Sequence, residues 1–292
     1  RFLAFTHSLP VSRPQKLEEP FSFRFTAMPN TRFVYPSYSG IEALARQYDV
    51  PQGNCAVVYN SLPLLEMLSQ DVQKVAGSID LLNADILAVY PGRLTTGKRF
   101  EKVAALAGAI QRKTEQRTRV IFCDFPSADI PGRIYKDTIR MEGQKFGLEA
   151  GNMVFTSDLG YEQGFPRQGV LELFTLSNLF LCPSYSESFG LTVLEAASRG
   201  NFLVLNEAVP ALKELGDSLG AYFMRWDARN FGYDTPERYV PSEQAYYEEH
   251  GERIVNFMRE DRSLRAKTRV RTQYHGAWIC RNQLMPLLTS TI

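Results

Sequence analysis

From Asp85 onward, short and uninterrupted apolar runs alternate with segments of helical periodicity. In runs such as Asp85–Gly92 and Leu179–Ser184, apolar residues follow one another without regular polar interruptions. Such continuous runs are typical of parallel strands that helices cover on both faces. The pattern therefore predicts a doubly wound α/β domain, in which ligands bind beyond the carboxyl ends of the strands.

The individual elements can be placed from these runs. Strands are expected at Asp85–Gly92, Arg119–Phe125, Asn152–Ser157, Leu179–Ser184, Phe202–Asn206 and Ala221–Trp226. Helices are expected at Lys98–Lys113, Ile134–Phe146, Val170–Ser177 and Leu191–Arg199. The places to look for chemistry are the loops after Gly92, Ser157, Ser184 and Asn206.

The first 62 residues are organised differently. They carry only three strand-like runs, at Phe2–Thr6, Thr31–Pro36 and Cys55–Tyr59, which are too few for a stable open α/β sheet. We expect residues 1–62 to be part of a second Rossmann-like domain whose first half is absent, and residues 63–83 to be a linker. The main domain is expected over 84–272. Tyr274 and Trp278 indicate that a terminal helix, 273–292, packs back on the first domain.

The composition excludes several classes of protein. With 33 Lys and Arg against 32 Asp and Glu, the net charge of +1 gives no electrostatic footprint for nucleic acid. No apolar run approaches the roughly 18 residues needed to span a bilayer. The four cysteines are scattered and form no C-x-x-C pair, so neither a zinc site nor a disulfide framework is indicated. We expect buried thiols in a reducing, cytoplasmic compartment, and no signal peptide is visible. However, the chain opens with Arg1 and not with Met, so we expect the true N-terminus, and any targeting segment with it, to be missing.

The first polar cluster follows the run that ends at Gly92. Gly92 permits a tight turn, and Arg93 and Lys98 then offer two cations near the start of the next helix, where backbone N–H groups also favour anions. A diphosphate would fit there. Taken alone, the two cations read more simply as solvated surface residues. The segment is not a Walker loop, because Arg99 stands where that motif needs Ser or Thr.

The second polar cluster is Pro183–Glu195, after another apolar strand. Glu187 lies in the loop and Glu195 eight residues later in the helix, a spacing that would place them on similar faces. Gly190 would let a ligand approach the backbone closely. Carboxylates suit vicinal sugar hydroxyls. Alternatively, Glu195 is a surface helix residue and Glu187 only favours a helix amino end.

The third candidate is His7, directly after the strand-like run Phe2–Thr6. Histidine is a common acid, base and hydrogen-bonding residue. A single histidine at a strand end is more often structural than catalytic, so His7 alone decides nothing.

Together these segments resemble one family. Cys182–Gly200, CPSYSESFGLTVLEAASRG, resembles the E-x7-E signature region of family 4 retaining glycosyltransferases, which have the two-domain GT-B fold. Tyr90–Ala107 resembles the diphosphate segment of the same family. Ser37–Leu62 resembles the end of the family's first domain, and Thr6–Ser8 would align with its histidine-containing strand end. The segments occur in the family's order and spacing.

The resemblance implies transfer of a hexose from a nucleoside-diphosphate sugar to an acceptor hydroxyl with retained configuration. Arg93 and Lys98 would bind the diphosphate, Glu187 the sugar hydroxyls and Glu195 the ribose diol. His7 would reach the sugar from the other domain. Further donor contacts are implied at Gly92, Thr156, Ser157, Ser188, Phe189, Gly190, Leu191 and Thr192. The loop around Phe155 would flank the base. No metal and no cofactor beyond the nucleotide-sugar co-substrate is implied.

The sequence also departs from the family pattern. Gly200–Leu203 lacks the usual proline, Asn206–Pro210 lacks the usual glycines, and Gly164–Gly169 within Asp158–Gly169 resembles an insertion beside the base site. Two alternatives therefore stay open, a non-catalytic nucleotide-sugar-binding relative and a GT-B epimerase or hydrolase. The acceptor could be a glycan, a lipid or a small molecule. Any peripheral membrane contact would belong to the absent part of the first domain.

Overall fold

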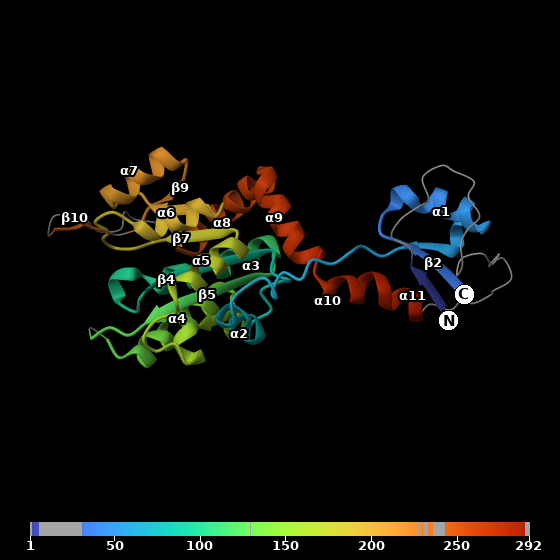
Figure 1. Ribbon diagram of the computed structural model, residues 1–292. Helices are drawn as coiled ribbons and strands as arrows, with labels where there is room; N and C mark the ends of the chain where they lie inside the picture. Colours follow the sequence, from blue (N-terminus) through green and yellow to red (C-terminus); the bar gives the residue numbers. More distant parts are fainter. Residues whose placement is uncertain are drawn as a thin grey trace. The chain divides into compact units, whose positions relative to one another are not determined.

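The computed structural model describes residues 2–5, 31–128, 130–226, 228–230, 233–235 and 243–289 (Figure 1). The chain divides into two compact units. One unit comprises Arg1–Pro63 and Gln273–Ile292, and the other comprises Leu64–Thr272. Each unit has its own parallel sheet and its own buried core, which confirms the predicted α/β class with two Rossmann-like parts.

The smaller unit is built on a three-stranded parallel sheet. Its strands, in spatial order, are β1 (Phe2–Phe5), β2 (Thr31–Tyr35) and β3 (Cys55–Val57). Helix α1 (Ile41–Tyr48) packs on this sheet, and Tyr48 stacks on Phe33 with ring centroids 4.6 Å apart. The helix ends where Asp49 takes a left-handed conformation.

The end of the chain belongs to the same unit. Its elements are α10 (Gly276–Ile279), a π-helical turn (Cys280–Leu284) and α11 (Met285–Thr289). Ile279 is buried with Val34 of β2, and Tyr274 stacks on Tyr59 at 5.5 Å. Helix and sheet of this unit are therefore joined by apolar and aromatic packing.

The larger unit contains a six-stranded sheet in the order β6-β5-β4-β7-β8-β9, with every described pairing parallel. The strands are β4 (Ile86–Arg93), β5 (Thr118–Phe125), β6 (Met153–Phe155), β7 (Leu179–Cys182), β8 (Phe202–Asn206) and β9 (Tyr222–Met224). They lie within two residues of the expected bounds. The chain runs outward from β4 to β6, then returns to β7 on the other side of β4. This reversal makes β4 and β7 the topological switch point, beside which ligands bind in open parallel sheets.

Helices cover both faces of this sheet (Figure 1). They are α2 (Gln70–Ser78), α3 (Phe100–Thr114), α4 (Gly132–Phe146), α5 (Arg167–Leu176), α6 (Leu191–Ser198), α7 (Pro210–Leu219), α8 (Glu243–Glu260) and α9 (Arg262–Gln273). Helix α3 packs between α4 and α8, and α5 packs between α2 and α6. The packing of α3 on α4 needs Gly108, because a Cβ there would lie 2.9 Å from the Gly143 carbonyl oxygen. A short antiparallel pair, β10 (Ala228–Asn230) and β11 (Tyr233–Thr235), follows β9.

Residues 64–83 are not the linker that the sequence suggested, because they belong to the larger unit. Helix α2 buries Val72 and Val75 completely, and Leu81 is buried just after it. Ser69, which precedes α2, donates from its backbone N–H and its hydroxyl to the Glu172 carboxylate of α5, at 2.8 and 2.7 Å. The apolar residues of α2 recur at helical spacing, which places them on one buried face.

None of the helices described here is long and apolar enough to cross a membrane.

Candidate functional site

At the carboxyl end of β4 the chain turns sharply toward α3. Arg93 ends the strand with an exposed side chain, and the buried Leu94 is fixed because its N–H donates to the Phe125 carbonyl of β5 at 2.8 Å. A 3-10 turn, Thr96–Lys98, follows. A hollow of about 600 Å³ opens at this edge and is lined by Pro91, Gly92, Arg93, Thr95, Lys98, Phe125 and Thr192. The structure thus brings Arg93 and Lys98 to one hollow, as the sequence suggested.

Tyr90, buried beneath this hollow, ties two loops together. Its hydroxyl donates to the Lys98 carbonyl at 2.6 Å and lies 3.2 Å from the Ser184 hydroxyl in the loop after β7. In addition, the Tyr185 N–H donates to the Gly97 carbonyl at 2.8 Å. Burial raises the pKa of Tyr90 well above its ordinary value, so the hydroxyl keeps its proton and can donate. The backbone of Lys98 is therefore fixed against the β7 loop.

Lys98 also pairs with Glu187, a residue from that same β7 loop. The Lys98 Nζ lies 2.5 Å from Oε1 of Glu187, and the two side chains are only 31% and 14% exposed. An ammonium group has three N–H donors, so Lys98 can hold Glu187 and still donate to an anion. Two residues that the sequence assigned to the same site thus meet, although 89 positions separate them.

The amino end of α6 borders the same hollow through Thr192. Gly190 enters this helix with φ of +92°, a conformation that side chains rarely adopt, and a Cβ there would lie 3.2 Å from the Val193 side chain. Its neighbours Phe189 and Leu191 are exposed. The first turn of a helix has N–H groups without helical partners, so this end can donate to an anion.

The predicted shared helical face of the two glutamates is wrong. Glu187 precedes the helix, and the left-handed Gly190 separates it from Glu195 in α6. The two carboxylates therefore pair with different cations from different elements, Lys98 and Arg167.

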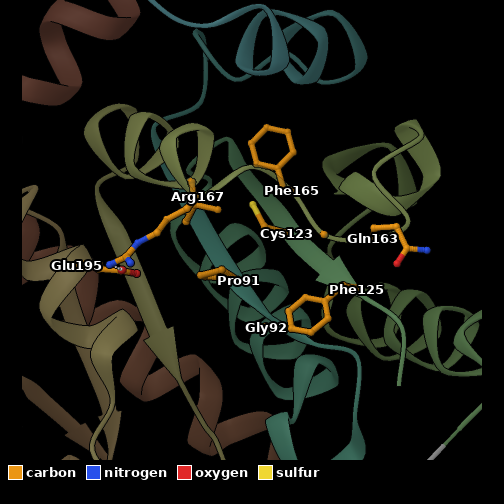
Figure 2. A pocket seen from close by; sticks show the side chains of 10 residues that line it. Pro91, Gly92, Cys123, Phe125, Gln163, Phe165, Arg167 and Glu195 are labelled. Carbon is orange, nitrogen blue, oxygen red and sulfur yellow. Dashed lines mark hydrogen bonds and ion pairs between the residues drawn. The ribbon is translucent and has the colours of Figure 1, made fainter. Parts of the chain in front are cut away.

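A second hollow, of about 350 Å³, shares a wall with the first. Figure 2 shows its aromatic side chains and the Arg167 side chain running toward Glu195. Its lining residues are Pro91, Gly92, Cys123, Phe125, Gln163, Gly164, Phe165, Arg167, Val170 and Glu195. Most of these groups are apolar, and the polar exceptions are the Gln163 amide, the Arg167 guanidinium and the Glu195 carboxylate.

Glu195 is held by an ion pair across this second hollow. Nη2 of Arg167, the first residue of α5, lies 2.7 Å from Oε1 of Glu195. The Glu195 side chain is 20% exposed, whereas that of Arg167 is 78% exposed. The carboxylate is thus mostly enclosed, while its partner lies mostly in solvent.

The loop after β6 does not place the expected side chains in either hollow. Thr156 is fully buried, and its hydroxyl has no hydrogen-bond partner among the residues that the structure describes. Ser157 is engaged elsewhere, because its N–H and hydroxyl donate to the Asp124 carboxylate at 3.1 and 2.5 Å, and its hydroxyl accepts from Lys136. Neither residue lines the two hollows. Phe125 and Phe165 stand there instead.

Asn206 holds the loop after β8 in place, in the segment where the family pattern leads one to expect glycines. Its buried side chain donates to the Ser184 carbonyl at 3.2 Å. Its amide oxygen accepts from the N–H groups of Ala208 and Trp226, both at 3.1 Å. One side chain thus joins the loops after β7, β8 and β9, and α7 begins at Pro210.

The remaining candidates are His7, possible metal ligands and the buried cysteines. His7 lies outside the described residues, so its position relative to the site stays a prediction. Within the described part of the chain, no three or more His, Cys, Asp or Glu side chains gather where they could hold a metal ion. Burial raises the pKa of Cys123, and burial followed by the nearby Glu187 raises that of Cys182 to about 11. Both thiols stay neutral at physiological pH.

Sequence reasoning missed four contributors to these hollows: Tyr90, Phe125, Phe165 and Arg167. Tyr90 and Phe125 resemble core residues because they end or nearly end apolar strands. Phe165 and Arg167 fall in Gly164–Gly169, the part of Asp158–Gly169 that resembles an insertion beside the base site in the sequence. That insertion was the available signal.

Part of the chain matches a known family. Residues 76–217 match the family model described as "Glycosyl transferases group 1". This segment belongs to the glycosyl transferases group 1. It begins in α2 and ends in α7, and therefore contains the lining residues of both hollows. The match confirms the family that the two sequence motifs indicated.

Several solved structures are similar to this chain at low sequence identity. A glycosyltransferase from Rickettsia africae ESF-5 is 11% identical, with a TM-score of 0.45 over 98% of this chain and 71% of that chain. Anabaena HepE in complex with UDP and glucose is 16% identical, with a TM-score of 0.43 over 88% and 60%. "Trehalose-6-phosphate from E. coli bound with UDP-2-fluoro glucose" is 13% identical, with a TM-score of 0.47 over 89% and 61%. This chain thus spans about three fifths of the latter two. No curated protein matches it.

Proposed function

We propose that this protein transfers a hexose from a nucleoside-diphosphate sugar to an acceptor hydroxyl, with retention of configuration. The observation that carries the proposal is a pair of adjoining hollows at the switch point of the sheet, which share Pro91, Gly92 and Phe125. One hollow is mostly apolar and contains the ion pair of Arg167 with Glu195, and the other carries the two cations Arg93 and Lys98. A nucleoside diphosphate likewise has a mostly apolar base at one end and a strongly anionic diphosphate at the other.

The apolar hollow suits the nucleoside. The base would contact the rings of Phe125 and Phe165, because aromatic faces stack on any nucleobase. The Gln163 amide offers both a donor and an acceptor to the base edge. The Glu195 carboxylate would accept hydrogen bonds from the two vicinal ribose hydroxyls. The expected role of the loop after β6 is thus assigned in part to the loop before α5.

The cationic hollow suits the diphosphate. When the bond between the anomeric carbon and the phosphate oxygen breaks, the leaving nucleotide gains negative charge. Arg93 and Lys98 would stabilise this charge together with the N–H groups at the amino end of α6. Because Tyr90 and Glu187 already hold Lys98, little reorganisation is needed during the reaction. In this proposal the two cations supply the charge stabilisation that the leaving nucleotide requires.

The transferred sugar would lie beside Glu187 and Gly190. Glu187 would accept hydrogen bonds from sugar hydroxyls, and the backbone N–H groups that follow Gly190 would contact the sugar or its phosphate. The proposed retention of configuration and the proposed hexose both rest on the family resemblance, as does the approach of His7 to the sugar.

Titration calorimetry of the complete chain with UDP, GDP and ADP tests the donor site. We expect one nucleotide to bind, and Lys98→Ala to raise its Kd at least about tenfold, which corresponds to about 1.4 kcal/mol. Lys113→Ala is the matched control, because Lys113 lies in α3 and pairs at 3.8 Å with Glu252, outside both hollows. Equal binding by wild type and Lys98→Ala would reject this site.

A product assay tests the reaction itself. The protein is incubated with the sugar form of the nucleotide that binds and with a set of hydroxyl acceptors, and the product is examined by NMR. Transfer with the donor's anomeric configuration supports the proposal. Free sugar would indicate a hydrolase, an altered donor sugar an epimerase, and unchanged donor with every acceptor a binding protein.

A further inference from the structure

We propose that Arg167 is a positioning residue that makes the site select ribonucleotides over 2′-deoxyribonucleotides. It would do so through Glu195, by holding the carboxylate in the orientation that accepts a ribose diol. This inference rests on the proposed function, because it assumes that a nucleoside diphosphate occupies the hollow lined by Phe125 and Phe165.

Glu195 depends on one described partner, Arg167. Nη2 of Arg167 lies 2.7 Å from Oε1 of Glu195, and the two residues come from different helices, α5 and α6. Among the described residues, Arg167 is the only group that pairs with the Glu195 carboxylate. Figure 2 shows the arginine reaching toward the carboxylate. Without Arg167, therefore, nothing described would fix the end of the glutamate side chain.

The ion pair leaves part of the Glu195 carboxylate available to a ligand. An ionised carboxylate accepts about four hydrogen bonds, and one oxygen of Glu195 is engaged by the guanidinium. The other oxygen, and the remaining lone pair of the first, stay available to two adjacent hydroxyls. A guanidinium holds a carboxylate more rigidly than an ammonium does, because it is planar. Fixing an acceptor in advance reduces the ordering cost of binding.

Arg167 borders the hollow without being part of the core of the protein. Its side chain lines the hollow and is 78% exposed. Ion pairs with such exposed members contribute little to stability of the fold. Removing the arginine should therefore leave the protein folded and change the behaviour of Glu195.

Calorimetry tests this proposal with the nucleoside diphosphate that the protein binds and with its 2′-deoxy form. Wild type should prefer the ribonucleotide. Arg167→Ala should reduce this preference by about threefold to tenfold, through weaker binding of the ribonucleotide, and Arg167→Lys should lie in between. Arg46→Ala is the control, because Arg46 is equally exposed, at 77%, and also pairs with a glutamate, but belongs to the other unit.

A double-mutant cycle between Arg167 and Glu195 distinguishes positioning from a merely structural role. If Arg167 acts through Glu195, Arg167→Ala should have no further effect on the ribose preference in a Glu195→Gln background. Thermal unfolding by circular dichroism shows whether each variant is folded.

Three results would overturn this inference and leave the proposed function intact. If Arg167→Ala weakens binding of both nucleotides equally, Arg167 contacts the nucleotide directly and away from the ribose. If the variant binds more tightly, Arg167 blocks the site. If binding does not change, the ion pair with Glu195 is an incidental surface pair. If wild type binds no nucleoside diphosphate, the proposed function and this inference both fail.

Discussion

Two glutamates eight residues apart, Glu187 and Glu195, have different surroundings in this protein. The ion pair of Glu187 with Lys98 is mostly enclosed, and Tyr90 fixes the lysine backbone from below. The pair of Glu195 with Arg167 is half open, because the arginine lies mostly in solvent. The end of the site that would hold the diphosphate is thus more constrained than the end that would hold the nucleoside.

This difference fits the two tasks that we assign to the ends. Charges act more strongly on one another where water is partly excluded, so cations at the enclosed end can stabilise a leaving group effectively. Removing one member of an enclosed pair also leaves an unpaired charge behind. At the open end, the exposed Arg167 is already solvated and can lose its partner at little cost. Substitutions at the enclosed end should therefore have the larger effects.

The largest effect is expected for Lys98→Ala. It removes a cation from the leaving group and leaves Glu187 without its partner, so kcat should fall by about 10²–10³, the usual loss for one stabilising donor. Transfer rates at saturating donor measure this. A loss below about threefold would mean that Lys98 does not act on the reacting phosphate and that the comparison between the two ends fails.

Substitutions of the two glutamates should affect different quantities, kcat for Glu187 and the nucleotide Kd for Glu195. Glu187→Gln should lower kcat by about tenfold to a hundredfold with little change in nucleotide Kd, because Glu187 pairs with Lys98 and, in our proposal, contacts the reacting sugar. Glu195→Gln should raise the nucleotide Kd by about tenfold and leave kcat nearly unchanged at saturating donor. Steady-state kinetics and calorimetry on both variants measure the split. The same pattern in both variants would contradict a division into two ends.

A smaller effect is expected for Tyr90→Phe, which keeps the ring and removes the hydroxyl. The free energy of unfolding should fall by about 1 kcal/mol, because the bond to the Lys98 carbonyl is lost in a buried place. The nucleotide Kd should rise by only a fewfold. Urea unfolding and calorimetry measure the two changes. A stability loss without any change in affinity would show that Tyr90 supports the core and does not position Lys98.

The sequence predicts the parts of this molecule that depend on local patterns. Continuous apolar runs located β4 to β9, and the polar residues directly after β4 and β7 meet at one edge, because parallel strands end there. Arg93, Lys98, Glu187 and Glu195 could therefore be found without coordinates. The linker prediction failed because Val72 and Val75 sit among polar residues, where short amphipathic helices are easily overlooked.

Long-range partners explain the remaining differences. Ser157 follows a strand like a site residue, but Asp124 of the neighbouring strand engages it, and no local pattern reveals that contact. Phe125 and Phe165 read as core residues, since aromatic side chains at strand ends and in loops are usually buried. Arg167 reaches Glu195 only because α5 and α6 lie side by side.

The most direct test of this account is a crystal structure of the protein with the nucleoside diphosphate that it binds. We expect the base against Phe125 and Phe165, the ribose hydroxyls on Glu195 and the diphosphate between Arg93, Lys98 and the amino end of α6. A nucleotide bound in the reverse direction, or outside these two hollows, would contradict the central claim.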